Sequence, residues 1–502
     1  MNRADETRGI SLDEPTIFER GSSGRRGYTL PPLDEREGDA ESLPAELCRK
    51  DLEDLPELSE MEVLRHFLRL SQWNFSAATN FYPLGSCTMK YNPVLNERVA
   101  RLAGFADLHP ATPPPAAQGA LELMAELERL LAEVSGMDAV SLQPAAGAQG
   151  ELAGMKMVRA YHLSRGNPRR KVLIPQSAHG TNPASSALCG YQVVAVASND
   201  RGMIEPRSVE QLADGETAAI MVTNPNTLGL FEQDIVRIAA AVHDKGALVY
   251  LDGANMNALL GVAKPGHMGA DVLQFNLHKT FSTPHGGGGP GAGPIAVKQA
   301  LADYLPVPRV VPAGGAWALS TEFPKSIGRV RAFYGNFGIL VRAYAYLLSL
   351  GGDGMRRATQ MAILNANYVR RRLEDVLEIA YDEPCLHECV FSDSKLEPLG
   401  VKTLDFAKRL LDHGFYAPTI YFPLIVSGAI MIEPTESETR ETLDEFVAAV
   451  RSIVAEAREN PGRVKGAPHR TRVSRLDEVR AARHPRLRWR REASPAESSG
   501  DG

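Results

Sequence analysis

The stretch 251–294 limits the fold of this chain more than any other part of the sequence. Within and just before it lie two largely apolar runs, 247–251 and 272–277, which lead to Asp252 and Lys279. Short apolar runs of this length, bounded by turn residues, predict buried strands. Four consecutive glycines follow, and glycine lets the backbone approach closely where a side chain would clash. The stretch therefore predicts two strands that deliver chemically useful side chains to a tightly packed loop.

The sequence before this stretch alternates strand-like runs with helix-like segments. Strand-like runs occupy 139–144, 171–175, 191–198 and 218–224. This alternation predicts an α/β fold, in which helices cover both faces of a mainly parallel sheet. Ligands of such sheets bind beyond the carboxyl ends of the strands. The candidate site residues that follow predicted strands are Ala146, Gly147, Ala148, His179, Asn224, Asp252 and Lys279.

Asp252 and Lys279 together suit the chemistry of pyridoxal 5'-phosphate (PLP). A lysine amine condenses with the aldehyde of this cofactor, and a carboxylate keeps its pyridine nitrogen protonated so that the ring accepts electrons. Either residue alone favours a plainer interpretation, because aspartate often caps helices and most lysines are solvated. Their order along the chain, with a strand between them and a glycine loop after Lys279, favours a PLP site. No metal ligand is predicted in it.

A helix N-terminus offers a place for the cofactor phosphate. Ala146, Gly147 and Ala148 are small residues at the start of a helix pattern, where free N–H groups point at an anion. Glycine at a helix start is also frequent without any ligand. His278 could reach the phosphate, because side chains alternate in direction along a strand. His285, in the glycine loop, could equally stabilise that loop.

Other side chains are candidates for contacts with the pyridine ring. His179 could stack on the ring, although a single histidine in a loop is more often a polar surface residue. Asn224 could hydrogen-bond the phenolic oxygen, and Thr223 or Asn226 could do so instead. Ala254 is small enough to lie under the ring on the face opposite the histidine. These assignments remain alternatives at the level of the sequence.

The chain of 502 residues is too long for one compact core, so two domains with extensions are expected. Helices are predicted at 60–70 and 120–134 from their apolar periodicity. The predicted organisation is an extended arm at 1–60, a helix and site-wall segment at 61–115, a PLP-binding domain at 116–320, a connector helix with a smaller α+β domain at 321–460, and a basic tail at 461–502. The arm and tail hold too few apolar residues to fold alone.

Composition argues against several classes of partner and location. The net charge of −6 gives no overall signal for nucleic acid, and no apolar run approaches the roughly 20 residues that span a bilayer. The N-terminus has no secretory apolar region, and the five cysteines form no disulfide framework, so a cytoplasmic location is predicted. Cys385 and Cys389 enclose a histidine and a glutamate, but zinc sites usually need more ligands at recognised spacings. We expect these two cysteines to be structural.

Several long motifs resemble those of the P-protein family of the glycine cleavage system, in its two-gene prokaryotic form. The similarity extends over nearly the whole chain. It rests on FYPLGSCTMKYNP, QPAAGAQGE, SAHGTNPASS, TNPNTLGLFE, DGANMNALLG, NLHKTFSTPHGGGGPGAGP, KSIGRVRAFYGNFGILVRAYAY and TIYFPLIVSGAIMIEPTE. His267 and Ser427 stand where that pattern favours acids, which alters local charge and no residue with a chemical role.

The resemblance implies a fold-type-I PLP enzyme that decarboxylates glycine. The remaining aminomethyl group passes to the lipoyl disulfide of a lipoylated H-protein. By the motifs, Lys279 bonds the cofactor, Asp252 contacts the pyridinium nitrogen and His179 stacks on the ring. The family also implies pairing with glycine dehydrogenase subunit 1 in an α2β2 heterotetramer. Ser86, Thr88 and Lys90, in the first motif, are candidates for lining the site.

Two other functions remain open at the level of the sequence. One is a different fold-type-I PLP enzyme, an aminotransferase or an amino-acid decarboxylase, in which Arg329 or Arg331 would grip the carboxylate of a larger substrate. The other is a non-catalytic scaffold subunit. The presence of both Asp252 and Lys279 argues against a scaffold.

Overall fold

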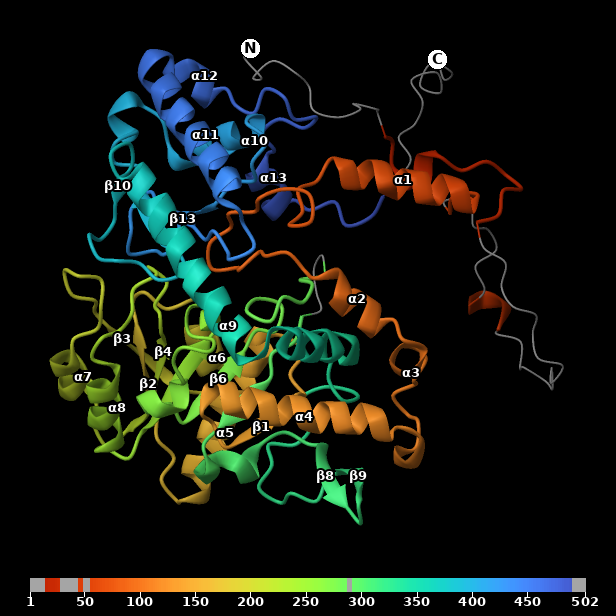
Figure 1. Cartoon of the computed structure of the whole chain (residues 1–502), viewed down its shortest axis with the longest axis vertical. Helices are drawn as coiled ribbons and strands as arrows, with labels where there is room; N and C mark the ends of the chain where they lie inside the picture. The colour runs from red at the N-terminus through yellow and green to blue at the C-terminus, as the bar shows by residue number, and fades with distance from the viewer. Residues whose placement is uncertain (1–13, 28–43, 48–54, 287–290, 490–502) are drawn as a thin grey trace. The chain divides into compact units, whose positions relative to one another are not determined.

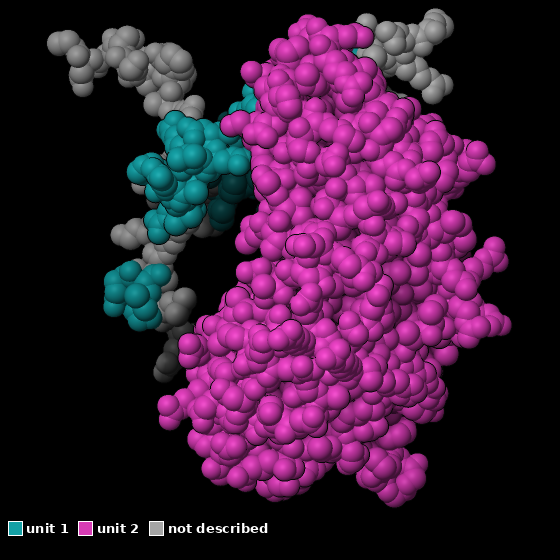
Figure 2. Space-filling view, turned by 90° about the vertical axis from the view of Figure 1, so that its left-hand side faces the viewer, with its two compact units in different colours: residues 1–75, 468–502 teal, residues 76–467 magenta. Residues whose placement is uncertain are grey.

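The structure is a computed structural model that describes residues 14–27, 44–47, 55–286 and 291–489. Cys48, three of the four consecutive glycines and the last two arginines of the RLRWRR run lie outside the described residues. The chain divides into two compact units, coloured separately in Figure 2: unit 1 is 1–75 with 468–502, and unit 2 is 76–467. All residues of the predicted cofactor site belong to unit 2.

Unit 2 contains a seven-stranded sheet with the strand order β1-β7-β6-β5-β4-β2-β3. Its strands are β1 (Ala139–Ser141), β2 (Lys171–Pro175), β3 (Gln192–Val196), β4 (Thr217–Thr223), β5 (Leu248–Gly253), β6 (Val272–Phe275) and β7 (Ile295–Val297). The neighbours from β6 to β3 are parallel, whereas β7 is antiparallel to both β1 and β6. The predicted α/β fold with a mainly parallel sheet is confirmed, and β7 adds an antiparallel strand that the sequence pattern did not indicate.

Helices cover both faces of the sheet, because successive side chains of a strand point to opposite faces. On β4, Ala219 and Met221 pack in one cluster with α5 (Gly147–Ser164). Ile220 packs on the other face with α8 (Ile235–His243). Every residue of β4 is buried, as expected for a central parallel strand. Figure 1 shows α7 (Pro206–Leu212) and α8 beside the strands of this half of the sheet.

Two further helices pack against β5 and β6. α4 (Gln118–Ser135) and the first part of α9 (Phe337–Leu373) share one buried cluster with Leu251 and Leu273. α4 extends the helix predicted at 120–134 by a residue or two at each end. Gly351, with φ 60°, interrupts the helical geometry of α9, and the helix then continues into the smaller domain. One long element thus connects the two parts of unit 2 (Figure 1).

The smaller domain is built on a four-stranded antiparallel sheet with the order β10-β11-β13-β12. Its elements are β10 (Glu378–Ile379), β11 (Cys389–Ser392), β12 (Thr419–Ile420), β13 (Ile430–Ile432), α10 (Thr403–Asp412), α11 (Arg440–Glu459) and α12 (Pro461–Lys465). The end of α9, together with α10 and α11, buries a common core that includes Leu373, Phe406 and Phe446. The predicted strands at 387–391 and 429–432 correspond to β11 and β13. His387 and Glu388 precede β11.

The remaining elements are short or lie outside the two sheets. They are α1 (Glu60–Gln72), α2 (Val94–Ala100), α3 (Ala103–Ala106), α6 (Thr181–Leu188), the hairpin β8 (Arg309–Ala313) and β9 (Ala316–Ser320), and α13 (Glu478–Arg483). Within unit 1, Phe18 stacks on Trp489 with ring centroids 5.0 Å apart, and Arg472 lies over the ring of Trp73. Parts of the arm and the tail therefore contact each other. No helix among the described residues is long and apolar enough to cross a membrane.

Candidate active site

Asp252 lies at the carboxyl end of β5, between two neighbouring strands. Its register partners are Thr223 on β4 and Gln274 on β6. The carboxylate Oδ1 accepts hydrogen bonds from Ala254 N at 2.9 Å and from Gln274 Nε2, and Oδ2 accepts one from Asn182 Nδ2 at 3.0 Å. The residue is buried. Donors on both oxygens fix the direction in which this carboxylate points.

Asn182 joins Asp252 to a second buried carboxylate, Glu151. Asn182 Nδ2 donates to Glu151 Oε2 at 2.8 Å, and Thr181 Oγ1 donates to Glu151 Oε1 at 2.9 Å. Burial raises the pKa of Glu151 above its ordinary value, and the charge of Asp252 adds to the rise. Glu151 therefore keeps its proton more readily than a solvated glutamate does.

Lys279 lies in a turn directly after β6. The turn is closed by Lys279 N, which donates to Asn276 O at 3.0 Å, and by Ser282 N, which donates to Lys279 O at 3.2 Å. The side chain is half-buried, and its Nζ has no hydrogen-bond or ion-pair partner within the described part of the chain. An amine held away from bulk water without a partner is unusual, because burial of an unpaired charge is costly. Lys279 is therefore available to a group that the protein chain itself does not supply.

Two neutral histidines flank this turn. The rings of His278 and His285 meet edge to face, with centroids 5.1 Å apart. Burial, with the charges of neighbouring groups, lowers the pKa of His278 to about 3 and that of His285 to about 4. At Gly291 an added Cβ would lie 2.1 Å from His278 Nδ1, so a side chain there would displace the imidazole. The glycine after the loop is therefore required by close packing on His278, as the sequence suggested for this loop.

The three alternatives after β4 differ in how the structure uses them. Asn226 is fully engaged: its amide donates to Gly202 O and Glu232 Oε1 at 2.9 Å each, and its carbonyl accepts from Leu228 N. Asn224 accepts a hydrogen bond from Glu232 N, but its Nδ2 has no partner among the described residues. Thr223 Oγ1 is likewise buried without a partner. The structure therefore leaves Asn224 and Thr223 as the side chains with free donors beside Asp252.

The N-terminus of α5 lies against the turn that carries Lys279. An added Cβ at Gly147 would lie 2.0 Å from the side-chain oxygen of Asn276, three residues before the lysine. The first N–H groups of any α-helix have no intrahelical acceptor, and Ala146, the N-cap of α5, provides no side chain to accept from them. Gly147 is buried and Ala148 is exposed. The three predicted residues thus form an uncapped helix start beside the lysine.

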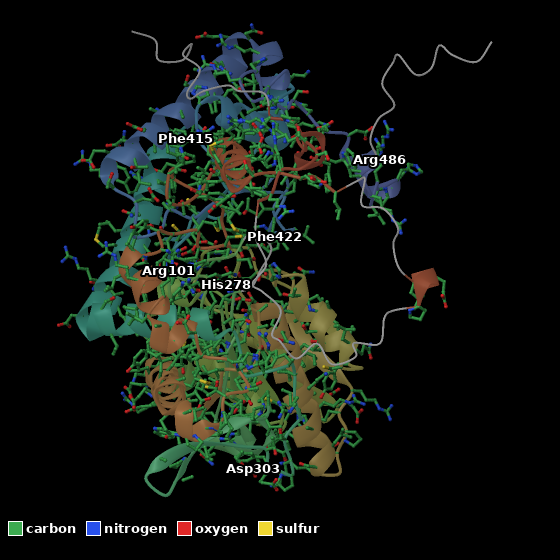
Figure 3. All side chains as sticks on the ribbon, turned by 90° about the vertical axis from the view of Figure 1, so that its right-hand side faces the viewer. Arg101, His278, Asp303, Phe415, Phe422 and Arg486 are labelled. Atoms are coloured by element: carbon green, nitrogen blue, oxygen red, sulfur yellow. The ribbon has the colours of Figure 1, made fainter. Side chains whose placement is uncertain are left out.

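His179 and Ala254, the two residues predicted to lie on either face of the pyridine ring, differ in their contacts. His179 is exposed, and its Nδ1 lies 2.8 Å from Thr181 Oγ1, the residue that also bonds Glu151. Its ring meets Phe422 of the smaller domain edge to face at 5.7 Å; Figure 3 labels Phe422 and His278. Ala254 is half-buried and donates its N–H to Asp252.

The predicted site-wall segment is the motif FYPLGSCTMKYNP at 81–93, and its residues 84–90 form a turn that contacts both domains of unit 2. Ser86 and Thr88 have left-handed backbone, with φ 64° and 48°, a conformation that costs energy for residues other than glycine. Lys90 is buried and fully paired, with Nζ 2.6 Å from Glu436 Oε1 and 3.0 Å from Asn257 Oδ1. Lys90 is therefore engaged inside the protein, whereas Cys87, in the turn before it, lies close enough to Lys279 for the lysine charge to act on its thiol.

Comparison with known proteins connects this geometry to a family. The family model described as "Glycine cleavage system P-protein" matches residues 39–314, and "Glycine dehydrogenase, C-terminal domain" matches 358–469. The probable glycine dehydrogenase (decarboxylating) subunit 2 of Caldanaerobacter subterraneus is 54% identical over 475 residues, which are 94% of this chain and 98% of that protein. The protein of the same name from Listeria innocua is 53% identical, covering 96% of this chain and all of its own length.

The chain belongs to the P-protein family, in its subunit 2 form. Among solved structures, a glycine decarboxylase (P-protein) in inhibitor-bound form matches with a TM-score of 0.69 at 23% identity, covering 82% of this chain and 93% of that one. An aspartate aminotransferase from Thermus thermophilus matches with a TM-score of 0.56 at 16% identity, over 75% of this chain and 99% of that one. These likenesses show the fold, that of the fold-type-I PLP enzymes. The predicted family and fold class are both confirmed.

The residues of this P-protein family member fit a PLP group. The unpaired Lys279 Nζ, the oriented Asp252 carboxylate and the free donors of Thr223 and Asn224 lie at neighbouring strand ends, and the uncapped start of α5 lies beside them. A buried polar atom without a partner in the chain needs an explanation, and a bound PLP group would supply one for Thr223 and Asn224.

Three residues around Asp252 were not predicted from the sequence. Asn182 and Gln274 donate to its carboxylate, and Glu151 accepts a hydrogen bond from the same Asn182 amide. Gln274 carried a usable signal, because it is a polar residue inside an otherwise apolar strand run and faces its register partner on β5. Glu151 and Asn182 gave none, since their helices meet only in the folded chain. Each is buried.

Proposed function

We propose that this chain is the PLP-carrying subunit that releases the carboxyl group of glycine as CO2 and passes the aminomethyl group to the lipoyl disulfide of H-protein. The observation that carries the proposal is the placement of Asp252 and an unpaired Lys279 at adjacent strand ends of this fold. Membership of the P-protein family places the chain in glycine cleavage. PLP, when bound, supplies the electron sink that lets the bond to the carboxylate break.

The side chains of the chain would then have distinct tasks. Asp252 would hold the proton on the pyridine nitrogen, since its carboxylate is fixed by Asn182 and Gln274 and cannot turn away. Lys279 would hold the cofactor covalently through Nζ until glycine replaces it. The start of α5 would hold the phosphate, with His278 nearby, and Asn224 or Thr223 would donate to the phenolic oxygen. His179 would stack on one ring face and Ala254 would leave room on the other.

The transfer step balances without any oxidant beyond the lipoyl disulfide. The bond between the glycine α-carbon and its carboxylate breaks, and CO2 leaves. A carbon–sulfur bond forms as the sulfur–sulfur bond breaks, and the second sulfur takes one proton. The reacting carbon must be kept from water, because proton capture would give methylamine instead. A half-buried lysine in a turn flanked by two neutral histidines suits such a site.

We also propose that the chain works in an α2β2 heterotetramer with glycine dehydrogenase subunit 1, and does so in the cytoplasm. The name of its relatives, subunit 2, implies a second subunit. α1 supports a contact, because an apolar stripe predicted from its periodicity is exposed on it, at Met61, Leu64, Phe67 and Leu68. Exposed apolar stripes of this kind often mark interaction surfaces.

The proposal is tested by the release of 14CO2 from carboxyl-labelled glycine. We expect release to require subunit 1 and lipoylated H-protein together, with the aminomethyl group recovered on the lipoyl arm by mass spectrometry. Unlipoylated H-protein is the matched control, since it differs only in the missing disulfide. Light scattering of the mixed subunits should give a heterotetramer. Equal rates without lipoate, or methylamine as the main product with lipoate present, would exclude the transfer to sulfur.

The rival substrate class has less support from the structure. Arg329 is exposed, and Arg331 is held by Asn336, which itself bonds the backbone of Ala145 and Gly291. An arginine tied into the scaffold in this way is not free to clamp the distal carboxylate of a larger amino acid. Family membership likewise favours glycine over the aminotransferase and scaffold alternatives.

A further inference from the structure

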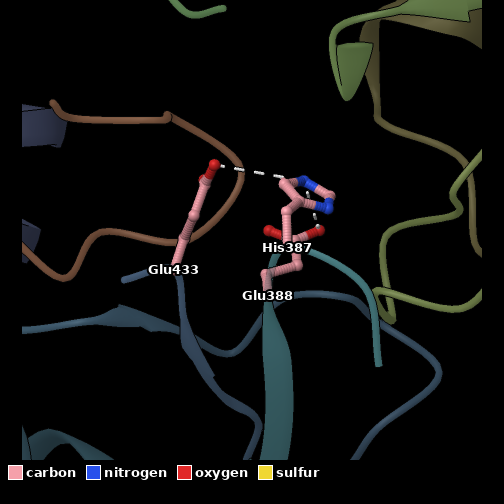
Figure 4. Close-up of side chains that lie close together, drawn as sticks. All are labelled: His387, Glu388 and Glu433. Atoms are coloured by element: carbon pink, nitrogen blue, oxygen red, sulfur yellow. Dashed lines mark ion pairs between the residues drawn. The ribbon is translucent and has the colours of Figure 1, made fainter. Parts of the chain in front are cut away.

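A buried group of three side chains lies in the smaller domain, where β11 begins and β13 ends. His387, Glu388 and Glu433 each offer a ligand atom, and these atoms lie within 4.8 Å of one another. His387 Nε2 is 3.8 Å from Glu388 Oε1 and 4.0 Å from Glu433 Oε1. Figure 4 shows the three side chains, with these two pairs joined by dashed lines. All three residues are completely buried. We refer to them as the His387 cluster.

The His387 cluster contains polar atoms that the protein leaves unused. Both ring nitrogens of His387 and Oε1 of Glu388 have no hydrogen-bond partner within the described residues. Buried histidines almost always have at least one partner, so a fully buried imidazole with two free nitrogens needs an explanation. A neutral imidazole is the form that ligates metal ions.

The two carboxylates are already oriented by the strained turn of the site-wall segment. Ser86 N donates to Glu388 Oε2 at 2.8 Å, and Thr88 N donates to Glu433 Oε2 at 2.8 Å. Thr88 Oγ1 also donates to Glu433 Oε1. Hydrogen bonds to the outer atoms of ligating side chains are the usual way in which proteins fix a metal site. The cluster is therefore preorganised, with Glu388 Oε1 and the imidazole left for another group.

The balance of charge points to a cation. The carboxylates of Glu388 and Glu433 are fully buried. Among the described residues, His387 is the only basic side chain within ion-pair distance of both carboxylates. A divalent ion would neutralise both carboxylates and occupy the free nitrogen at the same time. A proton would account for the charge and leave the imidazole unexplained.

We propose that the His387 cluster binds one divalent metal ion of the zinc class. One imidazole nitrogen and two carboxylate oxygens suit zinc and similar first-row ions, whereas magnesium and calcium prefer oxygen ligands alone. Two of the three ligands lie between Cys385 and Cys389. From the sequence, these cysteines were predicted to be structural and no metal site was predicted. The two cysteines stand outside the cluster, and the histidine and glutamate between them form it with Glu433. This inference does not depend on the proposed function.

The test is zinc binding by the untagged full-length chain loaded with PLP. After treatment with a chelator and dialysis, the protein is titrated with ZnCl2 by calorimetry, and bound metal is counted by mass spectrometry. We expect about one zinc per chain. Loss of an outer-shell partner alone weakens zinc binding about 10–100-fold, so His387→Leu and Glu433→Gln should each weaken it at least tenfold. Anomalous scattering at the zinc edge from crystals of the loaded protein should place the ion within the cluster.

Glu232→Gln is the matched control. Glu232 is another buried glutamate that accepts a backbone hydrogen bond, from Ile204 N at 2.8 Å. It is not part of the His387 cluster. This variant should bind zinc as the unmodified chain does. Circular dichroism and the absorbance of bound PLP check that all variants are folded. Absence of bound zinc after reloading, equal affinity in the cluster variants, or anomalous signal at a different place would each overturn the proposal.

Discussion

Replacing Lys279 by alanine is expected to abolish glycine-dependent CO2 release, with a loss of at least about 10³-fold, because no other amine can take over the covalent role. The visible absorbance of bound PLP should change at the same time, since the bond to the lysine is lost. Stability should hardly change, because Lys279 Nζ has no partner among the described residues. Thermal unfolding, absorbance and labelled-glycine assays on one preparation measure all three quantities.

Lys264→Ala is the control for the removal of a lysine. Lys264 lies in the same half of unit 2 and makes a surface ion pair with Glu133. Such pairs contribute little to stability, about 0–1 kcal/mol, so rate and absorbance should remain normal. An alanine variant at position 279 that kept both the absorbance and the rate would refute the assignment of the cofactor lysine.

Replacing Asp252 by asparagine is expected to lower the rate of CO2 release by about 10²–10³-fold, the usual cost of removing one preorganised electrostatic group from an active site. A neutral amide cannot stabilise the protonated pyridine nitrogen, although PLP should still bind. The side chain keeps its shape, but its nitrogen would face the donors of Asn182 or Gln274, so some loss of stability is also expected. Rate, PLP content and thermal unfolding separate these effects.

Asp271→Asn is the matched control. Asp271 directly precedes β6, at the end of the strand away from Lys279, and it accepts a backbone hydrogen bond from Val249 N at 2.8 Å. This substitution should reduce stability and leave the rate per bound cofactor unchanged. A near-normal rate in Asp252→Asn, at full PLP content, would contradict the role of Asp252.

The sequence was sufficient to predict the α/β architecture and the edge of the sheet where Asp252 and Lys279 meet. Strand and helix periods are local properties, and parallel strands bring their carboxyl ends to one edge. The family motifs then supported the same two residues. In contrast, β7 was not predicted to be antiparallel, because its three residues are too few to show a direction.

What the sequence could not indicate depends on contacts between distant segments. Lys90 was a candidate for lining the site, yet it is paired with Glu436, 346 residues along the chain. Glu151 reaches Asp252 only through Asn182, which lies on another helix. His387 and Glu388 were not predicted to bind a metal, because the two cysteines around them do not have a recognised zinc-site spacing and no further ligand was visible in the sequence. Their partner, Glu433, follows a different strand of the small sheet.

Reduction with borohydride, followed by peptide mapping, is the most direct test of the claim that this chain carries PLP on Lys279. The purified chain, loaded with PLP, is reduced and digested, and its labelled peptides are identified by mass spectrometry. The expected result is one pyridoxyl group, on the peptide that contains Lys279, with loss of the visible absorbance band. A label on any other lysine, or no label at all on a chain that retains its fold, would contradict the claim.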